Sequence, residues 1–421
     1  MRLAPAARHP SRHAPRAAEG REDDGPDRRD RSGVGAEALK RRRVSGSDRA
    51  PRAGDLQYRA RDRRRRGDDG RPTAGAALPY REAPPANDRG LVKRILSGIQ
   101  PSGEVHLGNY IGALQHWAAQ QDERDCFYCI VDLHAITVPQ DPATLRAATL
   151  DLAAILIAIG IDPERSTLFV QSHVHEHAEL AWVLGSIATF GELRRMTQFK
   201  DKLAKQKEAS VSVGYFTYPV LQAADILIYQ ADEVPVGEDQ RQHLELTRDI
   251  AIRFNTRYGE TFGVPEPSIP KVGAKILDLQ NPAAKMSKSA DSPRGTVKVT
   301  DTPDEIRKKI KVAVTDSGRD VVASPDRPAI TNLLTIYSVA TGRPVADVEK
   351  ELAGKGYADL KAGLADALIA FLEPIQKRYA ELKSDPGELQ TLLARGAEKA
   401  QAVASETLQT VHERVGFLPR G

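Results

Sequence analysis

From residue 92 onward, short apolar runs alternate with longer stretches in which apolar residues recur every three to four positions. The short runs predict buried β-strands, and the longer stretches predict amphipathic helices. We expect strands at 92–99, 127–131 and 167–170. The predicted helices lie at 108–120, 145–159, 178–190, 219–229 and 240–255. Buried strands alternating with helices predict a doubly wound parallel sheet, a Rossmann-type α/β catalytic domain.

After residue 303 the pattern changes, because only helical periodicity follows. The expected helices are 304–314, 330–341, 345–352, 357–383 and 388–415. We therefore predict two folded domains, the α/β domain over 91–302 and a C-terminal all-α domain over 303–421.

Residues 1–90 differ from both, since they contain no Ile, Phe, Trp or Cys. They carry 23 basic and 14 acidic side chains, a net charge of +9, whereas the rest of the chain carries −5. Such a segment buries too little apolar surface to offset its chain entropy, so it is predicted to be a disordered, Arg-rich tail. The composition fits either a basic arm that touches RNA or a solvated tail, and the interspersed acids favour the tail.

Composition also excludes several classes of protein. No apolar run reaches the roughly 18 residues of a membrane span, so no membrane partner is expected. Two cysteines exclude a disulfide scaffold and indicate a reducing compartment, which we take to be the cytoplasm. Cys126 and Cys129 are three positions apart on a predicted strand and should face opposite sides of the sheet. They are therefore expected to be buried thiols, and we predict no metal site.

The segment 98–110 links the first predicted strand to the first helix, where ligands bind in open parallel sheets. Its glycines would let a phosphate approach the backbone, and the helix from Gly108 would offer N–H groups to an anion. His106 could donate a hydrogen bond to phosphate oxygens, or it could merely cap the helix.

Two further segments carry candidate chemistry. The two lysines and two serines in 285–289 suit a pyrophosphate group, although an exposed polar loop would have the same composition. Glu238 and Asp239 precede a predicted helix. These acids could hold ribose hydroxyls or an amine, or they could simply complement the helix dipole.

In combination these motifs are more specific. His106-Leu107-Gly108-Asn109, followed about 180 residues later by Lys285-Met286-Ser287-Lys288-Ser289, resembles the signature pair of class I aminoacyl-tRNA synthetases. The segments 97–103, 132–137, 195–200, 218–227 and 236–240 look like those of bacterial tryptophanyl-tRNA synthetases. The resemblance runs in order from about Lys93 to the C-terminus.

This resemblance implies a homodimeric enzyme that activates L-tryptophan with ATP and Mg²⁺ and transfers it to tRNA(Trp). The C-terminal helices would recognise the anticodon. Lys285 and Lys288, with Asn109 and His106, match catalytic positions. ATP contacts would come from Gln100, Pro101, Ser102, Gly108, Asn109, Gly237, Glu238, Asp239, Ile276, Lys285, Met286, Ser287, Lys288 and Ser289. Tryptophan contacts would come from Asp225, Gln240, Tyr218 and His134.

The chain departs from the family pattern at two positions. Gln222 stands where a Met often contacts the indole, and His106 stands where this family often has Thr. Three alternatives share parts of the pattern: a tyrosyl-tRNA synthetase, a small nucleotidyltransferase, and a non-catalytic synthetase-like RNA-binding protein. The sequences around His134 and Asp225 favour tryptophan. The long helical region and the intact lysines disfavour the other two.

Overall fold

The computed structural model describes residues 92–205, 210–235, 237, 240–268, 275–287 and 292–419. The predicted tail lies outside these residues. The described chain contains one five-stranded sheet in the order β3-β2-β1-β4-β5, with every neighbouring pair parallel. Its strands are β1 (Arg94–Ile99), β2 (Asp125–Ile130), β3 (Thr167–Val170), β4 (Glu233–Pro235) and β5 (Glu266–Ser268). The predicted doubly wound parallel sheet is confirmed.

The strand order places a crevice beside β1. The sheet grows from β1 to β2 and β3 on one side and to β4 and β5 on the other. Connections therefore leave in opposite directions at the carboxyl ends of β1 and β4, which is where open α/β sheets bind ligands. The sequence pattern did not predict β4 and β5, because strands of three residues are too short to show an alternation.

Helices cover both faces of the sheet. In this part of the chain they are α1 (Leu107–Asn109), α2 (Gln115–Gln120), α3 (Asp132–Ala135), α4 (Pro142–Ala158), α5 (Glu176–Gly185), α6 (Phe190–Arg195), α7 (Thr197–Lys205), α8 (Val213–Ile228) and α9 (Arg241–Tyr258). A π-helical turn, Tyr110–Leu114, joins α1 to α2. Short 3-10 turns cover Gln171–His173 and Pro293–Gly295.

Strand β2 shows how the core divides between the two faces. Cys126, Tyr128 and Ile130 pack on one side, whereas Phe127 and Cys129 pack on the other. The two cysteines are free and buried, and burial raises the pKa of both thiols. Their predicted placement on opposite faces is therefore confirmed, and neither is poised as a thiolate.

Capping residues explain two errors in the predicted helices. The helix predicted at 178–190 ends at Gly185, because Thr189 starts α6 with its hydroxyl accepting from the Glu192 N–H. The helix predicted from Pro219 starts at Val213, because the Ser212 hydroxyl accepts from the Tyr215 N–H. Pro219 thus lies inside α8.

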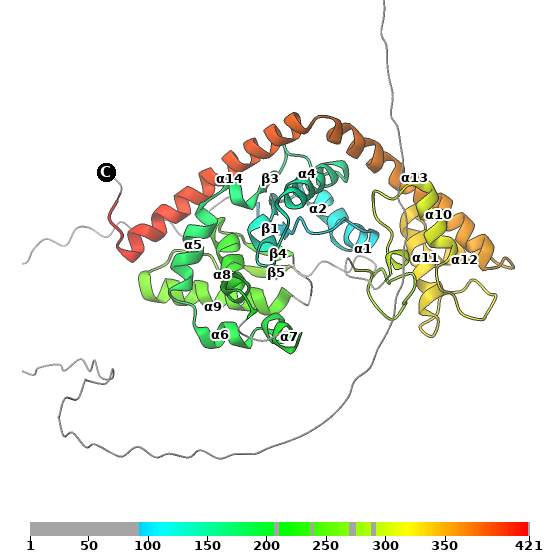
Figure 1. Ribbon diagram of the computed structural model, residues 1–421, viewed down its shortest axis with the longest axis horizontal. Coiled ribbons are helices and arrows are strands. Elements are labelled where there is room, and N and C mark those ends of the chain that lie inside the picture. Colours follow the sequence, from blue (N-terminus) through cyan, green and yellow to red (C-terminus); the bar gives the residue numbers. More distant parts are fainter. Residues whose placement is uncertain are drawn as a thin grey trace, which may run out of the picture. The chain divides into compact units, whose positions relative to one another are not determined.

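The region after residue 303 is helical, as predicted. Its helices are α10 (Pro303–Lys311), α11 (Pro328–Thr341), α12 (Val345–Glu351), α13 (Tyr357–Ser384) and α14 (Pro386–Val415). Helix α14 runs from the end of α13 back along β3 to α5 (Figure 1). It covers the β3 edge of the sheet, which an unprotected strand would leave open to pairing with another chain.

Gly396 allows α14 to approach β3 closely. A Cβ atom at this position would collide with the Leu168 carbonyl oxygen on β3. The contact is with backbone, which cannot rotate away as a flexible side chain could. Only glycine therefore permits this packing distance.

We predict that Gly396→Ala lowers the free energy of unfolding by about 1–3 kcal/mol, the usual range for overpacking a well-packed site. Gly387→Ala is the matched control, because Gly387 is exposed in the first turn of the same helix and an added Cβ there makes only an ordinary contact. Urea unfolding of both variants measures the difference. Equal stabilities would contradict the proposed close contact.

Candidate active site

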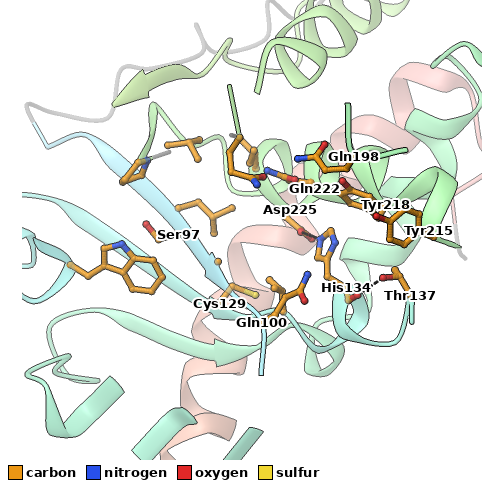
Figure 2. A pocket seen from close by; sticks show the side chains of 18 residues that line it. Ser97, Gln100, Cys129, His134, Thr137, Gln198, Tyr215, Tyr218, Gln222 and Asp225 are labelled. Atoms are coloured by element: carbon orange, nitrogen blue, oxygen red, sulfur yellow. Dashed lines mark hydrogen bonds and ion pairs between the residues drawn. The ribbon is translucent and has the colours of Figure 1, made fainter. Parts of the chain in front are cut away.

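A cavity of about 450 Å³ lies at the predicted crevice. Residues of β1 and β4 form part of its wall, and α8 forms another part. Five residues predicted from the sequence line it: Gln100, His134, Tyr218, Asp225 and Gln240. Figure 2 shows four of them with their side chains directed towards a common space, with Gln222 beside Asp225. The structure thus brings together all four residues predicted to contact an amino acid, and their roles remain predictions.

Asp225 is the most enclosed charged group of the cavity, with 4% of its surface exposed. His134 Nε2 lies 2.8 Å from its Oδ2. Gln171 Nε2 and His177 Nδ1 both lie 2.7 Å from its Oδ1. Burial by itself would raise the pKa of Asp225, but His134 and His177 outweigh burial and lower it below its usual range. Asp225 is therefore an ionised carboxylate, and all three neighbours donate to it.

The carboxylate keeps one hydrogen-bonding position for a ligand. Its two oxygens offer about four acceptor positions in total. Among the described residues, Oδ1 accepts from Gln171 and His177, whereas Oδ2 accepts only from His134. Because Asp225 lines the cavity, the remaining position on Oδ2 suits a ligand with a single N–H or O–H donor.

Tyr218 forms the neighbouring wall. Its hydroxyl lies 2.8 Å from Nε2 of His243, which is fully buried, and its ring meets His134 edge-on. Burial raises the pKa of Tyr218 well above its usual value, so the hydroxyl stays protonated. Gln240, at the start of α9, completes this side.

His106 caps α1. Its Nδ1 accepts from the Asn109 N–H at 3.2 Å, and the Asn109 Oδ1 accepts from the His106 N–H at 3.4 Å. The capping interpretation is confirmed, and in a neutral ring the His106 proton is on Nε2. We expected the backbone N–H groups at this helix start to be available to an anion, but two of them already donate hydrogen bonds. The Leu107 N–H donates to the Val297 carbonyl, and the Asn109 N–H donates to His106.

The segment 275–287 packs directly against this helix start. An added Cβ on Gly108 would lie 3.3 Å from the Met286 Cβ. Met286 and Ile276 are buried and joined by a 3.0 Å backbone hydrogen bond, while Lys285 is exposed. The two sequence motifs thus meet in space, and the buried Met286 anchors the exposed lysine.

Several predicted ATP contacts have a different environment from the one expected. The side chains of Ile276 and Met286 belong to the hydrophobic core, where burial stabilises apolar groups. They do not line the cavity. Pro101 is buried, whereas Ser102 and Ser287 are half-buried and Gly237 is exposed. Glu238, Asp239, Lys288 and Ser289 lie outside the described residues.

Sequence reasoning missed Gln171 and His177, which hold Asp225 from behind the cavity. Gln171 directly follows β3, and the carboxyl ends of parallel strands were already expected to form the site, so that rule could have found it. His177 gives a weaker signal, a polar residue on the buried side of a helix. Trp117, stacked on Tyr128, also lines the cavity and was not predicted.

Within the described ranges, no group of three or more His, Cys, Asp or Glu side chains is arranged to hold a metal ion. The same residues contain no helix that is both long and apolar enough to cross a membrane.

Comparisons with known proteins bear directly on this site. Residues 92–373 match the family model described as tRNA synthetases class I (W and Y). Tryptophan--tRNA ligase 2 of Streptomyces avermitilis is 58% identical over 338 residues, which cover 79% of this chain and 99% of that protein. The chain belongs to the tryptophanyl-tRNA synthetases.

Solved structures agree. The tryptophanyl-tRNA synthetase of Mycoplasma pneumoniae superposes with a TM-score of 0.70 at 37% identity, covering 78% of this chain and 99% of that chain. The Campylobacter jejuni enzyme, solved with ADP and tryptophan, gives 0.68 at 36% identity, with coverage of 77% and 100%. The tyrosyl-tRNA synthetase of Aeropyrum pernix matches at 22% identity, which shows the shared fold alone.

We predict that Gly108→Ala loosens the contact between α1 and the segment 275–287, because the new methyl group would crowd the His106 ring at 3.1 Å and Met286 at 3.3 Å. Amide hydrogen exchange across 275–287 should become faster. Gly112→Ala is the control, since an added Cβ at Gly112 meets nothing within 4 Å. Unchanged exchange in Gly108→Ala would contradict the packing described here.

Proposed function

We propose that the chain joins L-tryptophan to tRNA(Trp) in two ATP-dependent steps. The tryptophan carboxylate attacks the α-phosphorus of ATP, which forms tryptophanyl-adenylate and releases pyrophosphate. The terminal adenosine of the tRNA then attacks the adenylate and releases AMP. The observation that carries this proposal is a buried, ionised Asp225 with one open acceptor position, in a chain that is 58% identical over 338 residues to a tryptophan–tRNA ligase.

The cavity suits the chemistry of tryptophan. Indole has one N–H donor and no acceptor, so Oδ2 of Asp225 is a matched partner. Apolar side chains such as Leu96, Val131 and Ile226 provide walls for the ring. Tyr218, Gln240 and His134 supply polar groups for the amine and carboxylate. Gln222 lies three residues before Asp225 on α8, and no hydrogen-bond partner for its carboxamide is found among the described residues.

For ATP we propose the predicted set along 100–109, 237–239 and 276–289, with Ile276 and Met286 contributing backbone only. Asn109 retains its side-chain NH₂ as a donor after capping the helix. Lys285 and Lys288 would stabilise negative charge that shifts to the leaving pyrophosphate, so catalysis is electrostatic. Mg²⁺ would be carried by the ATP phosphates, as is usual for this ion, and would neutralise part of their charge.

We place amino-acid activation in residues 91–302 and anticodon recognition in the helices of 303–421. We also propose a cytoplasmic homodimer. Trp182 on α5 and Val213 at the start of α8 are each 77% exposed, and Phe190 at the start of α6 is 64% exposed. Large apolar side chains of this kind are suited to burial against a second copy.

The function is tested by ATP–pyrophosphate exchange with the full chain and each of the twenty amino acids in turn. Only tryptophan should support exchange. Exchange with tyrosine alone would instead favour a tyrosyl-tRNA synthetase. A lack of exchange with every amino acid would favour the nucleotidyltransferase or the non-catalytic protein.

We predict that Asp225→Asn lowers kcat/KM for tryptophan by about 10- to 100-fold, the effect of a hydrogen bond to a charged group. The preference for tryptophan over phenylalanine should shrink, because phenylalanine cannot donate to Asp225 in either protein. The Michaelis constant for ATP should stay close to that of the unaltered chain. Unchanged discrimination in the exchange assay would contradict the assignment of the indole partner.

We predict that Lys285→Ala slows adenylate formation about 10²- to 10³-fold, with little change in tryptophan binding. The reason is that a donor near the leaving group helps most in the transition state. Rapid-quench kinetics measure the step, and Lys355→Ala, an exposed residue beyond α12, is the control. An effect on tryptophan affinity alone would place Lys285 elsewhere in the reaction.

A further inference from the structure

A second layer of side chains lies behind Asp225, away from the cavity. His177, on α5, is fully buried, and its Nδ1 contacts Asp225 Oδ1 at 2.7 Å. Its Nε2 contacts the hydroxyl of Tyr229 at 2.7 Å, and Tyr229 is also fully buried. Gln171 contacts the same Asp225 oxygen from the turn after β3. None of these three side chains lines the cavity.

The direction of the hydrogen bond between His177 and Asp225 is fixed. An ionised carboxylate can only accept, so His177 must donate from Nδ1. Burial raises the pKa of Tyr229, so its hydroxyl keeps its proton. In a neutral imidazole the second nitrogen is an acceptor, so Nε2 then accepts from Tyr229. The donation from Nδ1 to Asp225 does not depend on whether Nε2 carries a proton.

This arrangement decides which carboxylate oxygen meets the substrate. Two donors occupy Oδ1 and hold it away from the cavity, so Oδ2 is the oxygen with an open position. Without these donors the carboxylate could rotate about its Cβ–Cγ bond or turn towards other donors. We propose that His177, assisted by Gln171, is a positioning residue for substrate selection, because it fixes the Asp225 carboxylate with Oδ2 towards the indole N–H. This proposal rests on the proposed function, since it assigns tryptophan to the cavity.

The alternative is that His177 only fills space. Its ring packs against Phe169 and Tyr229, with ring centroids 5.9 and 5.3 Å away. A space-filling role requires volume and shape, whereas positioning requires a donor at the site of Nδ1. Two amides separate these requirements. Asparagine places its NH₂ near the position of Nδ1, and glutamine places its NH₂ near the position of Nε2.

The experiment compares His177→Asn with His177→Gln in the full chain. Tryptophan-dependent pyrophosphate exchange is measured beside exchange with the analogue in which sulfur replaces the indole N–H, 3-(3-benzothienyl)alanine. The readout is the ratio of kcat/KM for the two substrates, which reports the hydrogen bond to Asp225. His177→Gln should lower this ratio about tenfold or more. His177→Asn should retain most of it.

A neighbouring residue supplies the control. Glu176 precedes His177 on α5 and is buried, but it accepts hydrogen bonds from Ser405 and Gln401 of α14 at 2.6 and 3.1 Å. Glu176→Gln should change the melting temperature while leaving the substrate ratio intact. If both His177 variants fail to fold, Gln171→Met removes the other donor to Oδ1 and should lower the ratio in the same way.

The outcomes separate this proposal from the function itself. Equal ratios in His177→Asn and His177→Gln, whether both lowered or both retained, would overturn the positioning role. If the His177 variants do not fold, an unchanged ratio in Gln171→Met would overturn it. If the unaltered chain does not activate tryptophan at all, the proposed function fails first.

Discussion

A carboxylate that has lost its water is stable only where other donors replace that water. Asp225 meets this condition with donors from three separate elements: His134 on α3, Gln171 after β3 and His177 on α5. The elements that follow β2 and β3 must therefore pack against α8 before the carboxylate is satisfied. These same donors leave a single acceptor position on the carboxylate. The contacts that stabilise the buried charge therefore also determine that a ligand at this point must supply one hydrogen-bond donor.

The part of the site built from residues 106–109 and 285–287 depends on a different interaction. Its two motifs are far apart in the sequence, and a contact between Gly108 and Met286 brings them together. Burial of Met286 fixes one point of the segment, so the adjacent Lys285 can remain exposed without the segment detaching. The buried Met286 holds the segment in place, and the neighbouring Lys285 stays accessible to solvent.

Helix α14 joins the C-terminal helices to the catalytic sheet. It covers β3 through the close approach at Gly396, and its Ser405 and Gln401 hold Glu176 on α5. His177 is the next residue on α5, so α14 is anchored one residue away from the side chain that contacts Asp225 Oδ1. The contact of α14 with Glu176 therefore links the packing of the C-terminal region to the geometry of the cavity.

The sequence by itself determined the class of fold, because buried strands and amphipathic helices leave patterns in adjacent residues. It also predicted four residues that line the cavity, since Asp225, His134, Tyr218 and Gln240 lie in segments that resemble a known family. The tertiary structure alone decided what no local pattern encodes. It added the short strands β4 and β5, buried Met286 and Ile276, and closed part of the helix start with His106. It also supplied His177 and Gln171 behind Asp225, because a hydrogen bond between residues 48 or 54 positions apart depends on packing and not on local periodicity.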